Sequence, residues 1–495
     1  MSTDKQADVI YYGGPIITMV DNRREVEAIA VAGGRIIATG EKEYVMRTKT
    51  AATRLVDLGG KTLMPAFIDA HGHFMNSPQV VRWANVSGPP VGSVTKIADI
   101  IPVLQEHVKQ QGIKPGDWIV GYGYDRSNLA EGRELTRDDL DPFFPDNPVM
   151  LIHSSNHGAV LNSAAFAVVG MDENTETPPG GVINRKPGTN IPAGFIMETA
   201  FLPLFGNMPQ PSEQELLDTL YVAQQIYTSA GVTTAQEGAT HAKDLQFLRK
   251  AAEQGLLYID VVSLPFILEV PALVREYAPS FRGTGPMDLP ETASQAFGVY
   301  QNRLKLQGVK FVLDGSPQGK TAFWTEPLLT KGPGGEENWR GAPIFPPEVV
   351  NKALAEVYEK GIQVFCHANG DAAIDMVIDG ARAAGVKASD DRRTVIIHSQ
   401  VMRPDQLDAY VELGFSPSFF TVHTFFWGSE HTANLGEKRA SFISPMASAV
   451  KKGLRCSNHN DFSVTPVDPM RMMWSSVTRQ AREGQILGPE ERVDR

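Results

Sequence analysis

The sequence predicts an α/β protein built on a (β/α)8 barrel. From residue 230 onward, short apolar segments alternate with segments whose apolar residues recur at helical spacing, as in 348–361 and 371–385. Such alternation is typical of a parallel sheet covered by helices. With the apolar segment at 66–73 there are eight strand candidates, which favours a barrel, and a doubly wound open sheet is the alternative. The other seven candidates are 231–238, 258–266, 308–315, 362–370, 394–400, 414–420 and 453–461.

The chain of 495 residues exceeds what one hydrophobic core normally supports, so more than one domain is expected. Its N-terminal segments are β-branched and separated by Gly-Gly pairs, which predicts hairpins of a small sheet or sandwich. We therefore divide the chain into a β-sandwich portion at 1–65 and a barrel at 66–495. A Pro- and Gly-rich region after the first barrel strand is too long for a loop, and it predicts an inserted subdomain at about 75–225.

Charge and composition disfavour several classes of binding partner and indicate the compartment. The formal net charge of -11 disfavours binding to nucleic acid or to an anionic membrane. The two cysteines, Cys366 and Cys456, indicate a reducing compartment without a disulfide framework. The first residues lack the pattern of a signal peptide, and no apolar run is long enough to span a bilayer. We expect a cytoplasmic protein that binds a small molecule.

The segment FIDAHGH places two histidines at the end of the first predicted strand. Alternate side chains of an extended strand share a face, so His71 and His73 are expected to point to the same side. Two imidazoles so placed can bind one metal ion. Two structural histidines are the alternative, and the residues downstream decide between these interpretations.

Further metal-binding residue types end other predicted strands. His367 ends the fifth strand, His398 the sixth and Asp461 the eighth. Because the active sites of such barrels form at the C-terminal ends of the strands, these side chains are expected to converge with His71 and His73. The shared position favours a metal site over separate structural residues.

Lys310 lies inside the fourth predicted strand, between Val309 and Phe311. A buried, charged lysine without a partner is costly, so an ion pair or a chemical modification is expected. A neutral lysine amine can react with CO₂ to give a carbamate, whose oxygens can bridge two metal ions. An ion pair with Asp314 is the alternative.

Five motifs together resemble the amidohydrolase superfamily: FIDAHGH, VKFVLDGS, VFCHANGDAAID, VIIHSQ and HNDFSVTPVDP. More narrowly, they resemble the metal-dependent branch that includes N-substituted formamide deformylases. The resemblance implies a distorted (β/α)8 barrel, a small β-sandwich built from both ends of the chain, and a homo-oligomer. Because the sequence stops soon after the last barrel segment, we expect the C-terminal half of that sandwich to be absent.

The resemblance also implies roles for individual residues. His71, His73 and Asp461 would bind one metal ion, His367 and His398 a second, and carboxylated Lys310 would bridge the two. Glu198 is the alternative bridge. Histidine nitrogens and carboxylate oxygens suit Zn²⁺, and we expect two zinc ions, with Mn²⁺, Fe²⁺ or Co²⁺ as alternatives.

These residue types indicate hydrolysis. A metal lowers the pKa of bound water to near 7, which supplies hydroxide at neutral pH. Asp461 would then act as general base and afterwards as general acid toward the leaving nitrogen. The predicted reaction is cleavage of an amide- or formamide-type C–N bond. The alternatives are a lactone, ester or cyclic amide as substrate, or a catalytically silent barrel that binds a ligand.

Residues outside the predicted ligand set are expected to contact the substrate. The candidates are Tyr124, His157, Glu198, Trp324, His423 and Trp427. Their largely aromatic character predicts a small, uncharged or weakly polar amide, and core packing or a structural hydrogen bond is the alternative for each. His423 and His431 are predicted to flank the loop that follows the seventh strand.

Overall fold

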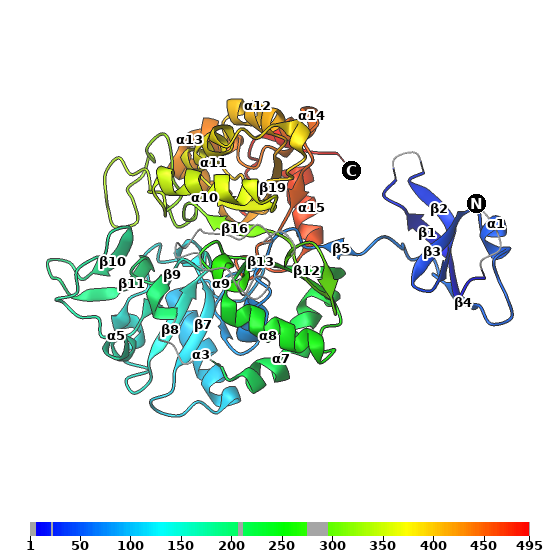
Figure 1. Cartoon of the computed structure of the whole chain (residues 1–495). Helices are drawn as coiled ribbons and strands as arrows, with labels where there is room; N and C mark the ends of the chain where they lie inside the picture. Colours follow the sequence, from blue (N-terminus) through cyan, green and yellow to red (C-terminus); the bar gives the residue numbers. More distant parts are fainter. Residues whose placement is uncertain (1–5, 21–22, 206–210, 275–295, 495) are drawn as a thin grey trace. The chain divides into compact units, whose positions relative to one another are not determined.

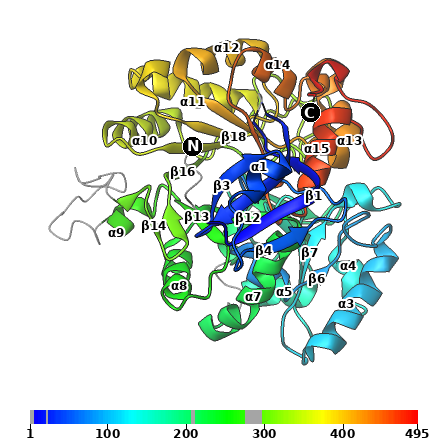
Figure 2. The same ribbon diagram turned by 90° about the vertical axis from the view of Figure 1, so that its right-hand side faces the viewer.

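The computed structural model describes residues 6–20, 23–205, 211–274 and 296–494. The chain separates into two compact units, residues 1–67 and residues 68–495. The ribbon diagrams in Figures 1 and 2 label the helices and strands of both units.

The N-terminal unit contains one four-stranded sheet in its described residues. The strands are β1 (Val9–Ile17), β2 (Glu25–Ala32), β3 (Arg35–Gly40) and β4 (Arg54–Asp57), in the order β3-β2-β1-β4. β1 pairs antiparallel with β2 and parallel with β4. Ile10, Ala28 and Ala30 form its core with Val45 of helix α1 (Lys42–Met46). The hairpin pattern predicted a small sheet or a portion of a sandwich, and the described residues of this unit form one sheet.

The C-terminal unit contains two five-stranded sheets that hold the predicted barrel strands. The first has the order β14-β15-β13-β12-β5. Its strands are β5 (Phe67–Ile68), β12 (Val232–Thr240), β13 (Asp260–Pro265), β14 (Tyr300–Gln301) and β15 (Leu304–Leu306). The second has the order β16-β17-β18-β19-β20 and is parallel throughout. Its strands are β16 (Val309–Val312), β17 (Val364–Ala368), β18 (Val395–His398), β19 (Ser416–Phe419) and β20 (Ser457–Asn458).

Backbone hydrogen bonds connect the two sheets at two places. Ile267, just after β13, donates its N–H to the carbonyl of Lys310 in β16. Beyond the ends of β5 and β20, Asp461 donates its N–H to the carbonyl of His71, and His73 donates to that of Phe462. The strand ladders of the described residues nevertheless form two sheets rather than one closed barrel.

Helices follow most of these strands, as the alternating pattern predicts. They are α7 (Glu213–Ser229), α8 (Ala242–Glu253), α9 (Val270–Val274), α10 (Pro347–Glu359), α11 (Asp371–Ala383), α12 (Pro404–Leu413), α13 (His423–Ser441), α14 (Met446–Lys451) and α15 (Pro469–Thr478). In α11, Ile374, Val377 and Ile378 are buried, because apolar residues three and four positions apart share one helix face. Within the described ranges, no helix is long and apolar enough to cross a membrane.

A third sheet lies in the segment between β5 and β12, within the region where an insertion was predicted. It has six strands in the order β10-β11-β9-β8-β7-β6. They are β6 (Ala84–Asn85), β7 (Ile119–Tyr124), β8 (Val149–His153), β9 (Gly158–Leu161), β10 (Gly181–Arg185) and β11 (Pro192–Glu198). The helices of this segment are α2 (Asn76–Val80), α3 (Ile97–Gln111), α4 (Arg137–Leu140), α5 (Ser163–Val169) and α6 (Leu202–Phe205).

Candidate metal centre

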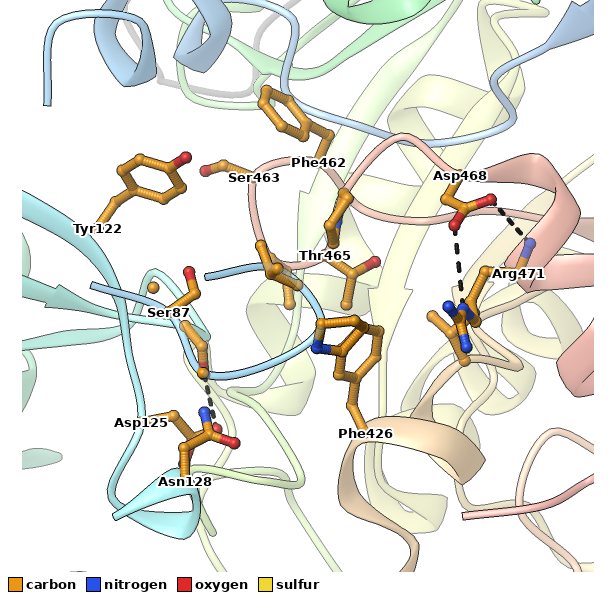
Figure 3. Close-up of a pocket in the computed structure, with 18 of the residues that line it drawn as sticks. Ser87, Tyr122, Asp125, Asn128, Phe426, Phe462, Ser463, Thr465, Asp468 and Arg471 are labelled. Atoms are coloured by element: carbon orange, nitrogen blue, oxygen red, sulfur yellow. Dashed lines mark hydrogen bonds and ion pairs between the residues drawn. The ribbon is translucent and has the colours of Figure 1, made fainter. Parts of the chain in front are cut away.

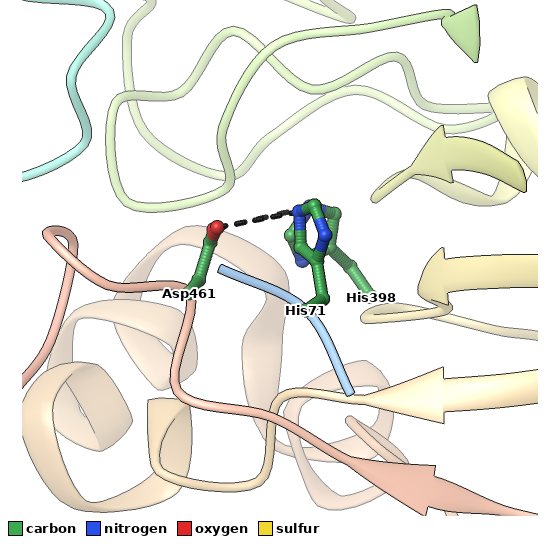
Figure 4. Close-up of side chains that lie close together, drawn as sticks. All are labelled: His71, His398 and Asp461. Carbon is green, nitrogen blue, oxygen red and sulfur yellow. Dashed lines mark ion pairs between the residues drawn. The ribbon is translucent and has the colours of Figure 1, made fainter. Parts of the chain in front are cut away.

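Three predicted ligands converge where strands of the C-terminal unit end. His398 is the last residue of β18, and His71 and Asp461 each follow a short strand by three residues. Potential ligand atoms of His71, His398 and Asp461 all lie within 4.8 Å of one another, and the three side chains are buried. Figure 4 shows both imidazoles on the same side of the Asp461 carboxylate.

His73 joins this group through Asp461. The Oδ1 atom of Asp461 lies 3.4 Å from His71 Nε2 and 3.3 Å from His73 Nε2, and its Oδ2 atom lies 4.0 Å from His398 Nε2. Asp461 Oδ1 is buried without a hydrogen bond, although two ring nitrogens approach it. A buried carboxylate oxygen without a hydrogen bond, faced by imidazole nitrogens, fits a divalent cation.

The protonation states of these residues suit metal binding. Burial raises the pKa of Asp461, but the close approach of His73 and the neighbouring His71 together hold that pKa well below its usual range. Burial and the charge of Lys310 lower the pKa of His71. Asp461 is therefore ionised and His71 is neutral near pH 7, which are the forms that coordinate metals.

The path of the chain around His71 and His73 differs from the prediction. The first strand was expected to reach residue 73, but β5 ends at Ile68. Beyond β5, the backbone N–H of His73 donates to the carbonyl of Phe462, so the chain no longer pairs as a strand of the sheet. The imidazoles of His71 and His73 nevertheless both approach Asp461.

Lys310 lies against this group from β16. Its Nζ atom is 3.3 Å from His71 Nε2, and its side chain is buried. Burial lowers its pKa to about 8, although the nearby Asp461 acts in the opposite direction. The alternative partner, Asp314, instead accepts hydrogen bonds from the backbone N–H groups of Asn369 and Gly370.

His367 extends the cluster on the far side of His398. Its Nδ1 atom lies 3.1 Å from His398 Nε2, and its Nε2 atom lies 3.2 Å from the carbonyl of Gly315. Asn369 Nδ2 approaches the same Nε2 atom at 3.1 Å. All six predicted metal ligands therefore lie in one connected group.

His459 belongs to the same group but was not predicted from the sequence. Its Nε2 atom lies 3.0 Å from His398 Nδ1, and its Nδ1 atom lies 3.0 Å from the hydroxyl of Ser418. If His398 Nε2 coordinates a metal, Nδ1 carries the proton and donates it to His459. His459 then donates from Nδ1 to Ser418, so the chain of bonds fixes the tautomer and orientation of His398.

Replacement of His459 is expected to weaken metal binding without removing a ligand. His459→Ala should raise the metal dissociation constant about 10- to 100-fold, the usual effect of losing a group that orients a ligand. Competition with a chromophoric chelator measures this constant. His431→Ala, which removes another buried histidine that hydrogen-bonds a histidine, is the control. Equal metal affinity in the wild type and His459→Ala would show that His398 needs no such support.

His157 and Glu198 form a partly buried ion pair beside His367. His157 Nδ1 lies 3.0 Å from Glu198 Oε2, and the His157 and His367 ring centroids are 6.1 Å apart. Burial lowers the pKa of His157, but the charge and hydrogen bond of Glu198 outweigh burial and raise it. Glu198 is the last residue of β11, with a φ of 51°.

Tyr124 and Trp324 lie in buried surroundings. The Tyr124 hydroxyl donates to Glu134 over 2.8 Å and accepts from the N–H of Leu135 over the same distance. Trp324 packs in an apolar cluster that includes Leu328. The structure does not bring these two side chains into direct contact with the six ligands described above.

His423 and His431, which were predicted to flank the loop after the seventh strand, lie on helix α13, which begins at His423. His423 Nδ1 is 3.0 Å from His431 Nε2, and both side chains are buried. The α13 segment has non-helical backbone at Trp427 and Gly436, where two shorter helices meet. Trp427 points its indole N–H at Asp125, 2.8 Å away.

A cavity of about 360 Å³, the large cavity, is lined by the residues that follow Asp461. Phe462, Ser463 and Thr465 of this loop line the cavity, and Figure 3 shows Ser463 pointing toward Tyr122. The loop that carries the candidate ligand Asp461 thus continues into the wall of a cavity of ligand size.

Comparison with known proteins places the chain among hydrolases. The sequence model of the amidohydrolase family matches residues 54–495. N-substituted formamide deformylase of Arthrobacter pascens is 25% identical over 483 residues, covering 96% of this chain and 85% of the relative. Protein LONG AFTER FAR-RED 3 of Arabidopsis thaliana is 26% identical over 478 residues, covering 96% and 78%.

Solved structures show the same fold. A protein described as an uncharacterized metal-dependent hydrolase from Pyrococcus horikoshii OT3 aligns with a TM-score of 0.71 at 21% identity, covering 98% of this chain and 89% of that chain. Its counterpart from Pyrococcus furiosus aligns with a TM-score of 0.69 at 22% identity, covering 98% and 91%. The fold is α/β of the TIM-barrel type, and the predicted resemblance to amidohydrolases is confirmed. The chain belongs to the amidohydrolase family and is a metal-dependent hydrolase.

Proposed function

We propose that the protein hydrolyses the C–N bond of a small, uncharged N-substituted amide of the formamide type. The observation that carries the proposal is the convergence of His71, His398 and Asp461 within 4.8 Å, with the other predicted ligands in contact with them. The similarity over 96% of this chain to an N-substituted formamide deformylase supports the formamide class.

The proposed centre holds two divalent metal ions, with zinc as the first candidate because of its imidazole and carboxylate donors. His71, His73 and Asp461 would hold one ion, and His367 and His398 the other. Such ions would activate water and polarise the substrate carbonyl. We further propose that eight parallel strands form the distorted barrel that supports this centre, with β15 and β16 counted together as one strand. The others are β5, β12, β13, β17, β18, β19 and β20.

Asp461 is the proposed proton carrier. Its ionised carboxylate can accept a proton from the attacking water and then deliver it to the leaving nitrogen as the C–N bond breaks. Its Oδ1 atom makes no hydrogen bond and faces His71 Nε2 and His73 Nε2 at 3.4 and 3.3 Å, beside the proposed metal centre. The products are a carboxylic acid, formic acid for a formamide, and an amine.

Lys310 is the proposed bridging residue in its carboxylated form. A pKa of about 8 leaves a substantial neutral fraction of the amine near neutral pH. Nucleophilic addition of Nζ to CO₂ forms a nitrogen–carbon bond and releases one proton, which gives a carbamate with two oxygens. The carbamate replaces a buried positive charge beside His71 with a negative group that suits two cations.

A substrate panel tests the proposed reaction. The metal-loaded protein is assayed for formate release from N-alkylformamides, and in parallel with anilides, lactones, esters and cyclic amides. We expect the highest kcat/KM with the formamides. A higher kcat/KM for a lactone or ester would assign the same centre to another substrate class, and no turnover of any amide would overturn the proposal.

A further inference from the structure

The large cavity presents mainly apolar and aromatic surfaces beside the loop that follows Asp461. Six side chains illustrate this character: Val91, Tyr122, Val422, Phe426, Trp427 and Phe462. Its volume of about 360 Å³ falls within the range of small-molecule sites. The cavity can therefore take an apolar group of a small molecule. Its wall is connected to the candidate metal centre by Phe462, which directly follows Asp461.

The charged groups along the large cavity already have partners within the protein. Arg482 donates to the carbonyl of Phe426 over 2.9 Å and also to Asn128. Asp468 accepts the N–H of Arg471 over 2.9 Å and lies 3.9 Å from its guanidinium, a pair visible in Figure 3. Each arginine along the cavity also has a carboxylate nearby, because Arg482 Nε lies 3.9 Å from Glu483 Oε1 and Arg471 pairs with Asp468. A charged substituent would lose its hydration and compete with these ion pairs, so the cavity favours uncharged groups.

Trp427 forms a wall of the large cavity and is held in place by Asp125. The Asp125 Oδ2 atom accepts the Trp427 indole N–H over 2.8 Å and the Ser154 hydroxyl over 3.1 Å. Trp427 and Asp125 also line a second cavity of about 180 Å³, whose wall includes Arg126 and Lys320. The fixed indole thus stands between an apolar cavity and a charged one.

Ser463 offers a hydrogen-bond donor within the large cavity. Its Oγ atom accepts from Asn76 Nδ2 over 3.4 Å and from Asn156 Nδ2 over 3.2 Å. A hydroxyl has two acceptor sites and one proton, so its proton is left to donate elsewhere. In Figure 3 the hydroxyls of Ser463 and Tyr122, both lining the cavity, point toward each other.

We propose that the large cavity binds an uncharged, apolar substituent on the substrate nitrogen, that Trp427 limits the size of this substituent, and that Ser463 hydrogen-bonds the amide group. The inference rests on the proposed function and narrows its substrate class to N-alkyl amides. Asp125 is then a positioning residue, which acts through the indole that it holds.

The first test compares substituents on the metal-loaded wild-type protein. Formate release is followed with N-methyl-, N-butyl- and N-cyclohexylformamide and with the charged N-formylglycine. We expect kcat/KM to rise about fourfold for each buried methylene, or roughly 60-fold from N-methyl to N-butyl. N-formylglycine is expected to react more slowly than N-methylformamide.

Three variants then test Trp427 as the wall of the cavity, Asp125 as the residue that positions it, and Ser463 as the hydrogen-bond donor. Trp427→Phe and Asp125→Asn should each raise the N-cyclohexyl to N-butyl ratio of kcat/KM, by at least about fivefold for Trp427→Phe. Ser463→Ala should lower kcat/KM up to about tenfold for every formamide, as expected for loss of one hydrogen bond. Trp118→Phe is the matched control, because it also replaces an indole by a phenyl ring. Trp118 directly precedes β7, whereas Asp125, which holds Trp427, directly follows the other end of that strand. This control should leave the ratio unchanged.

Binding without hydrolysis separates this inference from the proposed function. The probe is 2-hexanone, which has an apolar chain and a carbonyl but no C–N bond, and tryptophan fluorescence follows its binding to the metal-loaded protein. The expected quenching is lost in Trp427→Phe and kept in Trp118→Phe. Quenching without turnover of any formamide would support the cavity and overturn the proposed function. Turnover that is independent of substituent size, with equal ratios in wild type and Trp427→Phe, would overturn the inference.

Discussion

Asp461→Asn is expected to lower kcat about 10⁴-fold, the upper end of the effect of a general acid–base group. Asparagine keeps the size of the side chain and one oxygen, but it cannot accept and return a proton. It also removes the negative charge that His71 and His73 approach at 3.4 and 3.3 Å. Initial rates of formate release, with metal content measured on the same sample, give the effect.

Metal content separates the two roles of Asp461. A sample that keeps its metal but loses activity assigns the loss to proton transfer, whereas loss of both assigns it to coordination. Asp260→Asn, at the N-terminal end of strand β13, is the control and should retain wild-type rates. Full activity of Asp461→Asn with metal bound would contradict the proposed mechanism.

Lys310→Ala is expected to lose one of the two metal ions and at least about 100-fold in kcat/KM, because even groups that merely orient ligands contribute 10- to 100-fold. The substitution leaves a space beside His71 where the buried side chain stood. A short carboxylate such as acetate or propionate fits this space and supplies two oxygens. Added carboxylate should therefore restore part of the metal content and activity.

Lys310→Met is the matched control for this rescue. Methionine fills most of the space without supplying an oxygen, so it should lose activity as Lys310→Ala does but gain nothing from added carboxylate. Lys305→Ala, on the neighbouring strand β15, should retain wild-type metal content. Wild-type metal content in Lys310→Met would exclude a bridging carbamate and leave Lys310 only its contact with His71.

The alternation of strands and helices could be predicted because each element has its own hydrophobic pattern in the local sequence. The apolar runs that become β17 and β18 are buried, and the amphipathic pattern at 371–385 becomes α11. Histidines at the ends of such strands could be predicted to meet, because parallel strands bring their ends to one edge. These inferences need only local periodicity and one rule of topology.

Features that depend on distant contacts could not be predicted in this way. His459 hydrogen-bonds His398 although the two residues are 61 positions apart in the sequence. The motif that contains His459 indicated only Asp461 as a ligand. The α13 helix was missed because its aromatic residues and its break at Gly436 hide the helical period. The bond between Asp125 and Trp427 joins residues 302 positions apart, so no local pattern indicates it.

The most direct measurement of the central claim is the number of metal ions per chain, by elemental analysis of protein purified without chelators. The proposed centre predicts about two equivalents of a divalent metal, as in other two-metal hydrolytic sites. One equivalent would contradict the carbamate bridge and leave Lys310 as a neighbour of His71. No bound metal, and none taken up on reconstitution, would contradict the assignment of His71, His398 and Asp461 as a metal centre.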